Sequence, residues 1–466
     1  MTKDILSLSV AELTAHYRLR VLSPVEVAQV HLDRAIAVES KIAAFQILTP
    51  DLALEQAKAS RARWAEGKAL GELDGVPVTI KDNLDVAGLP TRHGSLTTSD
   101  KPVQEDSPAV TRLREAGAII LGKTTTPEFA WKGTTDSTLR GTTRNPWNTN
   151  HSSGGSSGGG GAALAAGVGT LALGNDGGGS IRIPASFCGL FGIKPTFGRV
   201  PHRQYGLFCT IASNGPIARS VADAAAMLRV LARPDSRDYY AAPPPSDEWL
   251  TNLGAGIKGL KIAYSPALQG IEPDAHVARA VADAIALARD LGAEVEEIGP
   301  VIEPLRPTFK DHWKAGFSAR LKDVPSEQWD LVEPGFRRLA EEGMNISGEA
   351  LHKAEVARAK LYETMAALHE RFQILVTATT PHTAPAADVI YNGPDYDRWN
   401  DAVPYTVPFN LTGQPAASLP CALSPGGLPI GLQLVGPRFA DELVLQACQA
   451  LETAIGPQTG KYRELA

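Results

Sequence analysis

Two glycine- and serine-rich runs in the middle of the chain carry the residue types that acyl transfer needs. The first spans residues 154–161, and the second is Asp-Gly-Gly-Gly-Ser over residues 176–180. A flexible linker is the usual interpretation of such a run, but here a predicted helix and strand lie between the two. Consecutive glycines allow backbone N–H groups to converge on one point, where they can bind an oxyanion. We therefore predict that Ser180 is a nucleophile. Its oxyanion hole would consist of Gly177, Gly178 and Gly179.

A serine nucleophile needs a base, and histidine is the usual one. None of the ten histidines lies in the two runs, and the nearest, His151, lies in a segment predicted to be an exposed loop. Lys81 is the stronger candidate, because it follows the apolar run 76–80, which is a predicted strand. Desolvation lowers the pKa of an amine, so a lysine emerging from a buried strand can accept a proton near neutral pH.

A second assignment of the nucleophile is open. Residues Gly154, Ser156 and Gly158 fit the GxSxG pattern of an α/β-hydrolase esterase, with His382 as a later partner. That pattern requires a strand directly before the serine, whereas residues 145–153 are predicted to be loop. The comparison favours Ser180 as nucleophile over Ser156.

A literal match to a nucleotide-binding motif occurs at residues 117–124, which fit GxxxxGK[ST] and include Lys123. The four residues between the glycines form an apolar run typical of a buried strand, and a phosphate-binding loop would follow a strand instead. Nucleotide binding is therefore not the favoured interpretation.

The elements that would position these residues alternate between helices and strands. Ser9 with Glu12, and Ser23 with Glu26, mark the starts of two helices in an N-terminal helical layer over residues 1–70. A further helix is predicted over residues 275–291, and residues 300–370 are predicted to be a helical, cap-like region. The predicted strands are 76–80, 118–121, 170–173, 261–264, 374–378 and 432–435. This alternation predicts an α/β fold with a large mixed β-sheet covered by helices on both faces, in a single domain over residues 1–466.

Composition restricts the partners. The net charge is −6 without long runs of one sign, which favours neither nucleic acid nor a membrane surface as a partner. The four cysteines are scattered and form no zinc-binding pattern, so we expect no metal and a cytoplasmic location. No cofactor is expected, and the chain would act as a monomer or a homodimer.

The motifs described above resemble those of the amidase signature enzymes, most strongly in five stretches. These are residues 73–83, 117–127, 145–196, 213–223 and 410–437. The resemblance implies hydrolysis of a non-peptide C–N bond through an acyl-enzyme, in an α/β/α fold. It also implies that Ser180 is the nucleophile, that Ser156 is a bridging serine after a cis peptide bond, and that Lys81 is the terminal base.

The resemblance also implies features of the substrate pocket. Phe129, Ala130 and Trp131 would line it, although a core position is an equally good interpretation of these three residues. Arg182 would pair with a substrate carboxylate or be held by Asp176 or Asp82. Gly177 departs from the family pattern, because many members have Thr there, and Gly160 stands where Ser, Ala or Glu is frequent.

The implied substrate is a small amide, an aryl or alkyl amide, or a carbamate. The family also includes the glutamine-hydrolysing component of the glutamyl-tRNA(Gln) amidotransferase, which works in a complex, so a glutamine amidase component of this kind is the alternative. Residues 132–141 and 182–184 lack the more polar side chains associated with that component, and we therefore expect a stand-alone hydrolase.

Overall fold

An 11-stranded sheet forms the centre of the computed structural model, which describes residues 5–203, 206–246, 248–303, 306–388 and 404–456. Its strand order is β1-β3-β2-β8-β10-β9-β14-β15-β13-β11-β12. Strand β2 runs parallel to β3 and β8, and β11 runs parallel to β12 and β13, whereas the other neighbours are antiparallel. The sheet is therefore mixed, as the sequence predicts. The strands are β1 (Phe45–Leu48), β2 (Pro77–Lys81), β3 (Ile119–Thr124), β8 (Leu171–Asp176), β9 (Phe191–Lys194), β10 (Ser213–Ala218), β11 (Lys261–Tyr264), β12 (Glu294–Glu297), β13 (Ile374–Ala378), β14 (Ala416–Leu423) and β15 (Pro429–Val435).

Helices cover both faces of this sheet, and the side chains of β3 show how. Ile119 and Leu121 belong to an apolar cluster that includes residues of α3, α4 and α6, whereas Ile120 belongs to a cluster with residues of α2, α5 and α8. Successive side chains of a strand point to opposite faces, so each face has its own core. The helices on the first half of the chain are α2 (Val10–Arg18), α3 (Pro24–Ile42), α4 (Pro50–Ala65), α5 (Pro108–Glu115), α6 (Gly158–Ala165), α7 (Arg182–Cys188) and α8 (Val221–Leu231).

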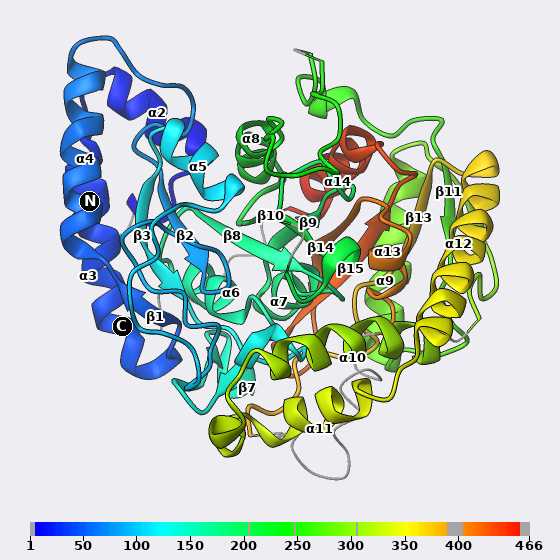
Figure 1. The fold of residues 1–466 in the computed structure, drawn as a ribbon. Coiled ribbons are helices and arrows are strands. Elements are labelled where there is room, and N and C mark those ends of the chain that lie inside the picture. The colour runs from blue at the N-terminus through cyan, green and yellow to red at the C-terminus, as the bar shows by residue number, and fades with distance from the viewer. Residues whose placement is uncertain (1–4, 204–205, 247, 304–305, 389–403, 457–466) are drawn as a thin grey trace.

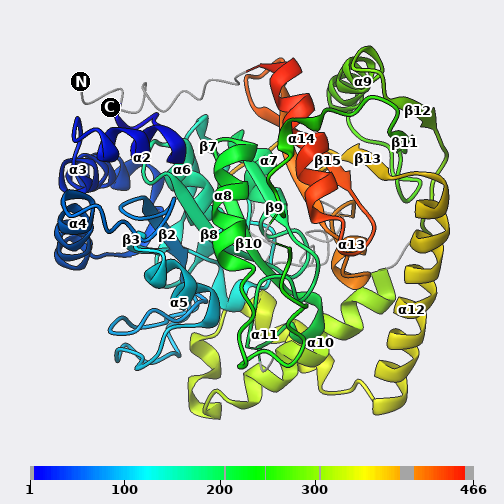
Figure 2. The ribbon, with the colours of Figure 1, turned by 90° about the horizontal axis from the view of Figure 1, so that it is seen from above.

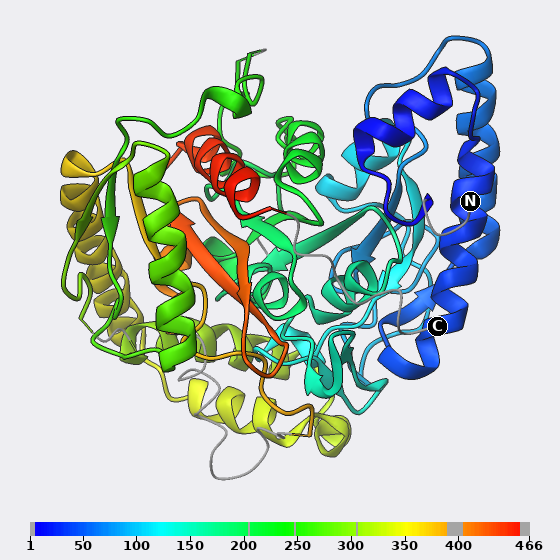
Figure 3. The same ribbon diagram turned by 180° about the vertical axis from the view of Figure 1, so that it is seen from behind.

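The second half of the chain adds the helices that surround the other end of the sheet. Figure 1 shows α3 and α4 along one edge of the molecule and α12 along the opposite edge. Seen from above, α10 and α11 lie on the side opposite α14 (Figure 2), and α14, in red, lies beside α8 (Figure 3). These helices are α9 (Ala275–Asp290), α10 (Arg306–Lys322), α11 (Pro334–Gly343), α12 (Gly348–Arg371), α13 (Pro408–Leu411) and α14 (Asp441–Ile455).

Local sequence signals place several element boundaries. Ser9 and Ser23 each accept a hydrogen bond from the backbone of the glutamate three residues on, and each glutamate bonds back, so both predicted capping boxes are confirmed. The predicted strands at 261–264 and 374–378 coincide with β11 and β13. The first 70 residues contain strand β1 as well as helices, and residues 306–371 contain α10, α11 and α12.

One local prediction is wrong. The sequence predicts loop over residues 145–153, but β6 (Arg144–Asn145) and β7 (Asn148–Ser152) form a short antiparallel hairpin. Its backbone pairs because Asn145 and Ser152 hold the hairpin closed: the Asn145 amide donates to the Ser152 carbonyl at 3.2 Å. This hairpin is separate from the 11-stranded sheet. In the described ranges no helix is both long and apolar enough to cross a bilayer.

Candidate active site

Lys81 is the last residue of β2 and lies inside the molecule. Its neighbour Ile80 points to the face covered by α5 and α8, so Lys81 points to the opposite face, which α6 covers. The Nζ atom lies 2.7 Å from Ser156 Oγ and 3.1 Å from the Asn175 carbonyl oxygen. Lys81 is 1% exposed, and this burial lowers its pKa to about 7, although the nearby Asp176 carboxylate acts in the opposite direction. The side chain can therefore hold or release a proton near neutral pH.

Ser156 lies in the turn that leads into α6, after a cis peptide bond between Gly155 and Ser156. The backbone fits closely here, because a Cβ on Gly155 would come within 2.3 Å of the Thr134 carbonyl oxygen. Thr135 fixes the turn from the same side, since its hydroxyl donates to the Gly154 carbonyl at 2.8 Å. These contacts place the Ser156 hydroxyl beside Lys81.

Ser180 ends the second glycine run, between β8 and α7, and is 6% exposed. The two runs touch, because the Ser157 N–H donates to the Ser180 carbonyl at 3.2 Å. The structure thus brings Lys81, Ser156 and Ser180 to the same end of the parallel strands β2 and β8, as the sequence analysis predicts for a shared site.

The Asp176 carboxylate shapes the glycine loop from inside. It accepts hydrogen bonds from the Gly179 N–H at 2.6 Å and from the Ile181 N–H at 3.1 Å. The Asn410 amide and the Arg182 guanidinium donate to the same carboxylate at 2.9 and 3.0 Å. Burial opposes ionisation of Asp176, but Arg182 and Asn410 outweigh it and hold its pKa below the usual range. The Gly179 N–H is therefore bound within the loop, although an oxyanion-hole role was expected for it.

Arg182 has a structural position. It is fully buried, and besides Asp176 it donates to the Gln433 side chain and to the Thr406 carbonyl, both at 2.8 Å. Of the two expectations for Arg182, the ion pair with Asp176 is the one present. Asp82 has a different partner, Lys123, at 2.9 Å.

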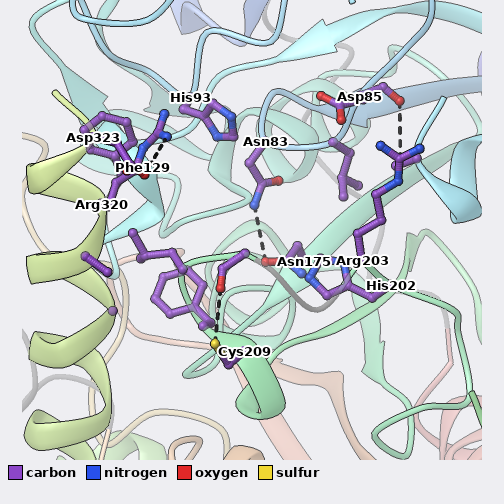
Figure 4. Close-up of a pocket in the computed structure, with 17 residues that line it drawn as sticks. Asn83, Asp85, His93, Phe129, Asn175, His202, Arg203, Cys209, Arg320 and Asp323 are labelled. Atoms are coloured by element: carbon purple, nitrogen blue, oxygen red, sulfur yellow. Dashed lines mark hydrogen bonds and ion pairs between the residues drawn. The ribbon is translucent and has the colours of Figure 1, made fainter. Parts of the chain in front are cut away.

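A cavity of about 380 Å³ adjoins the site. Asn83 and Asn175, which donate and accept a 3.3 Å hydrogen bond, form its wall next to Lys81, and Figure 4 shows this bond as a dashed line. Helix α10 forms another wall through Arg320 and Asp323 (Figure 4). The volume lies in the range of small-molecule sites. The cavity is lined by Asn83, Leu84, Asp85, His93, Ser107, Phe129, Asn175, His202, Arg203, Gly206, Leu207, Phe208, Cys209, Gly316, Ala319, Arg320 and Asp323.

The three residues predicted to line a substrate pocket separate in the structure. Phe129 lines the cavity, with the Arg320 guanidinium 4.7 Å from its ring centre. Ala130 and Trp131 do not line it; both are buried, and the Trp131 indole N–H donates to Glu333 at 2.8 Å.

Sequence reasoning did not identify Phe208 or the α10 residues as part of this cavity, because they lie far from the glycine runs along the chain. Asn83 lies within the stretch 73–83, which carries one of the sequence motifs, so its position there was the available signal.

The alternative motifs find no support in the geometry. Lys123 lies in strand β3 and donates to Thr91 and to the Pro90 carbonyl, both at 2.8 Å, so residues 117–124 form no phosphate-binding loop. The Nδ1 atom of His151 contacts the Ala384 carbonyl at 2.8 Å, and that of His382 contacts the Thr383 carbonyl at 2.7 Å. Among the residues with described positions, no three His, Cys, Asp or Glu side chains gather as a metal site would require.

Comparison with known proteins gives this geometry a family. The Amidase family model matches residues 26–445, and the chain therefore belongs to the amidase family and is a C–N hydrolase. It is 35% identical to an acylamidase of Rhodococcus erythropolis over 97% of this chain and 96% of that protein. It is also 36% identical to the A-type component of the glutamyl-tRNA(Gln) amidotransferase of Moorella thermoacetica, over 96% of each chain.

Solved structures agree on the fold. A bacterial aryl acylamidase of the amidase signature family superimposes with a TM-score of 0.89 at 28% identity, covering 98% of each chain. A 6-aminohexanoate cyclic dimer hydrolase superimposes with a TM-score of 0.90 at 28% identity, covering 97% of this chain and 99% of the other. The sheet and its helical layers are thus those of the amidase signature fold.

Proposed function

We propose that this chain hydrolyses amides through an acyl-enzyme, with Ser180 as nucleophile, Ser156 as proton relay and Lys81 as base. Neutral Lys81 accepts a proton from Ser156, and Ser156 accepts one from Ser180, whose Oγ attacks the carbonyl carbon. The relay then returns a proton to the leaving amine, and water hydrolyses the acyl-enzyme by the same route.

The position of Lys81 is the observation that carries this proposal. An amine bonded to a serine hydroxyl at 2.7 Å, and brought by burial to a pKa of about 7, is neutral in a large fraction of molecules at physiological pH. A neutral amine has a lone pair that can accept the Ser156 proton, which a charged ammonium lacks.

We assign the oxyanion donors to the N–H groups of Gly177 and Gly178. Gly179 supports them instead, because its own N–H is bound to Asp176. The buried Asp176–Arg182 pair holds the loop, so the donors are fixed before substrate arrives, which is the condition for electrostatic stabilisation of an oxyanion.

The substrate we propose is a small aryl or alkyl amide, or a carbamate, taken up by a stand-alone enzyme. Phe129, Leu84 and Phe208 give the cavity apolar surface beside polar groups such as Asn83. The acylamidase and aryl acylamidase relatives support an amide with an apolar group.

The proposed roles are tested by labelling with phenylmethylsulfonyl fluoride or a fluorophosphonate and locating the modified residue by mass spectrometry. We expect the label on Ser180, no labelling of Ser180→Ala, and slow labelling of Ser156→Ala and Lys81→Met. A label on Ser156 in the Ser180→Ala variant would reverse the two serines and favour the esterase assignment.

A glutamine amidase component of a tRNA-dependent amidotransferase is the second candidate, because relatives of that kind match 96% of this chain. The two candidates differ in what the purified chain does alone. A stand-alone amidase hydrolyses acetanilide without partners, whereas activity on glutamine that appears only with partner proteins would support the amidotransferase.

A further inference from the structure

Gly177 faces an aromatic ring. A Cβ placed on Gly177 would lie 3.0 Å from Phe208 Cγ, and 3.2 and 3.3 Å from the two Cδ atoms of that ring. Carbon atoms in van der Waals contact are separated by about 3.5–4.0 Å, so a side chain at 177 and the present ring position exclude each other. The missing side chain of Gly177 is therefore matched by the ring of Phe208.

The ring has little room to move away from Gly177. Its centre lies 5.2 Å from Trp313 and 6.2 Å from Phe317, both on α10. The preceding residue, Leu207, is held against the same helix, because a Cβ on Gly316 would come within 2.1 Å of the Leu207 carbonyl oxygen. With α10 behind it and Gly177 beside it, the ring can be displaced only toward the cavity that it lines.

Phe208 thus connects the glycine loop to the cavity wall. The aromatic contacts continue from Phe317 to Phe336 at 4.9 Å and from Phe336 to Phe129 at 4.9 Å. Phe129 lines the same cavity (Figure 4), so aromatic side chains bound it at two places. Flat rings packed in this way favour a planar group between them, through offset or edge-to-face contacts.

We propose that Gly177 and Phe208 form a specificity-determining pair, in which the ring next to the glycine loop selects amides bearing a planar aromatic group. This proposal rests on the proposed function, because it takes the loop to be the one that presents the nucleophile. The pair acts on substrate choice, whereas the oxyanion donors act on every amide alike.

The test uses acetamide, benzamide and acetanilide as substrates. Benzamide places a ring on the acyl side and acetanilide places it on the amine side, so the two arms show which side enters the cavity. For each variant we compare kcat/KM for each ring substrate with kcat/KM for acetamide. In wild type we expect the ring substrates to be favoured after correction for their uncatalysed rates.

Gly177→Ala is expected to lower this ratio ~10-fold for at least one ring substrate, because the new Cβ pushes the Phe208 ring into the cavity. Phe208→Ala also lowers the ratio, since the wall is lost. In the Phe208→Ala background, Gly177→Ala changes the ratio less than about twofold, because no ring remains to be pushed. Gly254→Ala is the matched control, since a Cβ there meets nothing within 4 Å.

Two outcomes overturn the pair: an equal loss on all three substrates in Gly177→Ala, or independent, multiplicative effects of the two substitutions on the ratio. If Gly177→Ala does not fold, Phe208→Leu decides the question, because an unchanged ratio in that variant contradicts selection by the ring. Failure of the proposed function looks different: Ser180→Ala would then keep its activity on all three substrates, whatever the ratios show.

Discussion

Four buried lysines show how the chain treats an amine inside the protein. Lys123 is paired with Asp82, and Lys132 with Glu333 and Asp136. Lys194 and Lys81 instead contact neutral oxygen atoms, and burial lowers the pKa of each to about 7. Lys194 donates to backbone carbonyls, which cannot exchange a proton, whereas Lys81 contacts the Ser156 hydroxyl. The hydroxyl distinguishes a base from a structural cation.

The pKa of Lys81 predicts the pH dependence of the reaction. Protonation removes the base, so log kcat/KM should fall with unit slope as the pH decreases below about 7 and level off above it. Enzyme pre-incubated at each pH and assayed at pH 8 separates titration from denaturation. A flat profile from about pH 5 to 9 would contradict a lysine base.

Lys81→Met should be inactive but more stable than wild type at neutral pH. The folded pKa of Lys81 is about 7 and the unfolded pKa is about 10.4, so between these values unfolding takes up a proton. Wild-type stability therefore rises with pH through this window, and below it the full cost of burying the amine remains. The gain in Tm should be largest at or below pH 7 and disappear near pH 10. A variant that loses stability at pH 7 would count against this cost.

At the scale of elements, buried polar groups attach the segment after β3 to helix α11. Glu333, just before α11, accepts from the Trp131 indole at 2.8 Å and contacts Lys132, which also bonds Asp136 at 2.6 Å. Against the effect of burial, Glu333 and Asp136 raise the pKa of Lys132. Asp136 accepts from the Thr134 hydroxyl at 2.9 Å, and Thr134 lies against Gly155. The network therefore reaches the turn that carries Ser156.

Lys132→Met should destabilise the fold by ~3–5 kcal/mol, because it leaves the carboxylates of Glu333 and Asp136 without their buried partner. Lys353→Met is the matched control, since Lys353 and Glu349 form an exposed pair on α12 and their loss should cost ~0.5 kcal/mol or less. Urea unfolding of both variants measures the difference. Equal losses in the two variants would show that the buried network contributes no more than a surface pair.

The elements that the sequence predicted are those whose local pattern agrees with the final structure. The capping boxes of α2 and α3 and the apolar runs of β11 and β13 are of this kind. Strands β10 and β14 were not predicted, because Pro216 and Pro420 interrupt them, and a proline usually argues against a central strand. At Pro420 the pairing with β15 is irregular, which accommodates the residue. Only the surrounding sheet makes such strands form.

The same distinction holds for the site. Lys81, Ser156 and Ser180 stand in motifs with local signals, and the structure brings them together as expected. The cavity wall on α10 has no such signal, because the distance between Phe208 and Trp313 along the chain is closed only by folding. The neighbours of Trp131 in sequence predict a pocket position for it, yet its indole is turned to Glu333.

At the scale of the whole molecule, the helices of residues 306–371 are joined to the sheet through side chains that cross between them. Arg358 on α12 donates to the Thr210 hydroxyl at 2.7 Å and to the Leu411 carbonyl. Phe317 on α10 and Phe336 on α11 are fully buried and belong to the same apolar cluster as Val78 and Ile80 of β2. One continuous core therefore includes both the sheet and these helices.

This continuity predicts that the cap-like helices unfold together with the sheet. Chains longer than about 150 residues frequently unfold through intermediates, so a single transition is a specific expectation for 466 residues. In urea, the near-ultraviolet signal of the tryptophans and the far-ultraviolet signal of the backbone should change at the same midpoint. Lys132→Met should move both midpoints together, because its network connects α11 to the segment beside the active site. A variant in which the two signals separate would show that residues 306–371 form an independent unit, and the single domain proposed for residues 1–466 would then have to be divided.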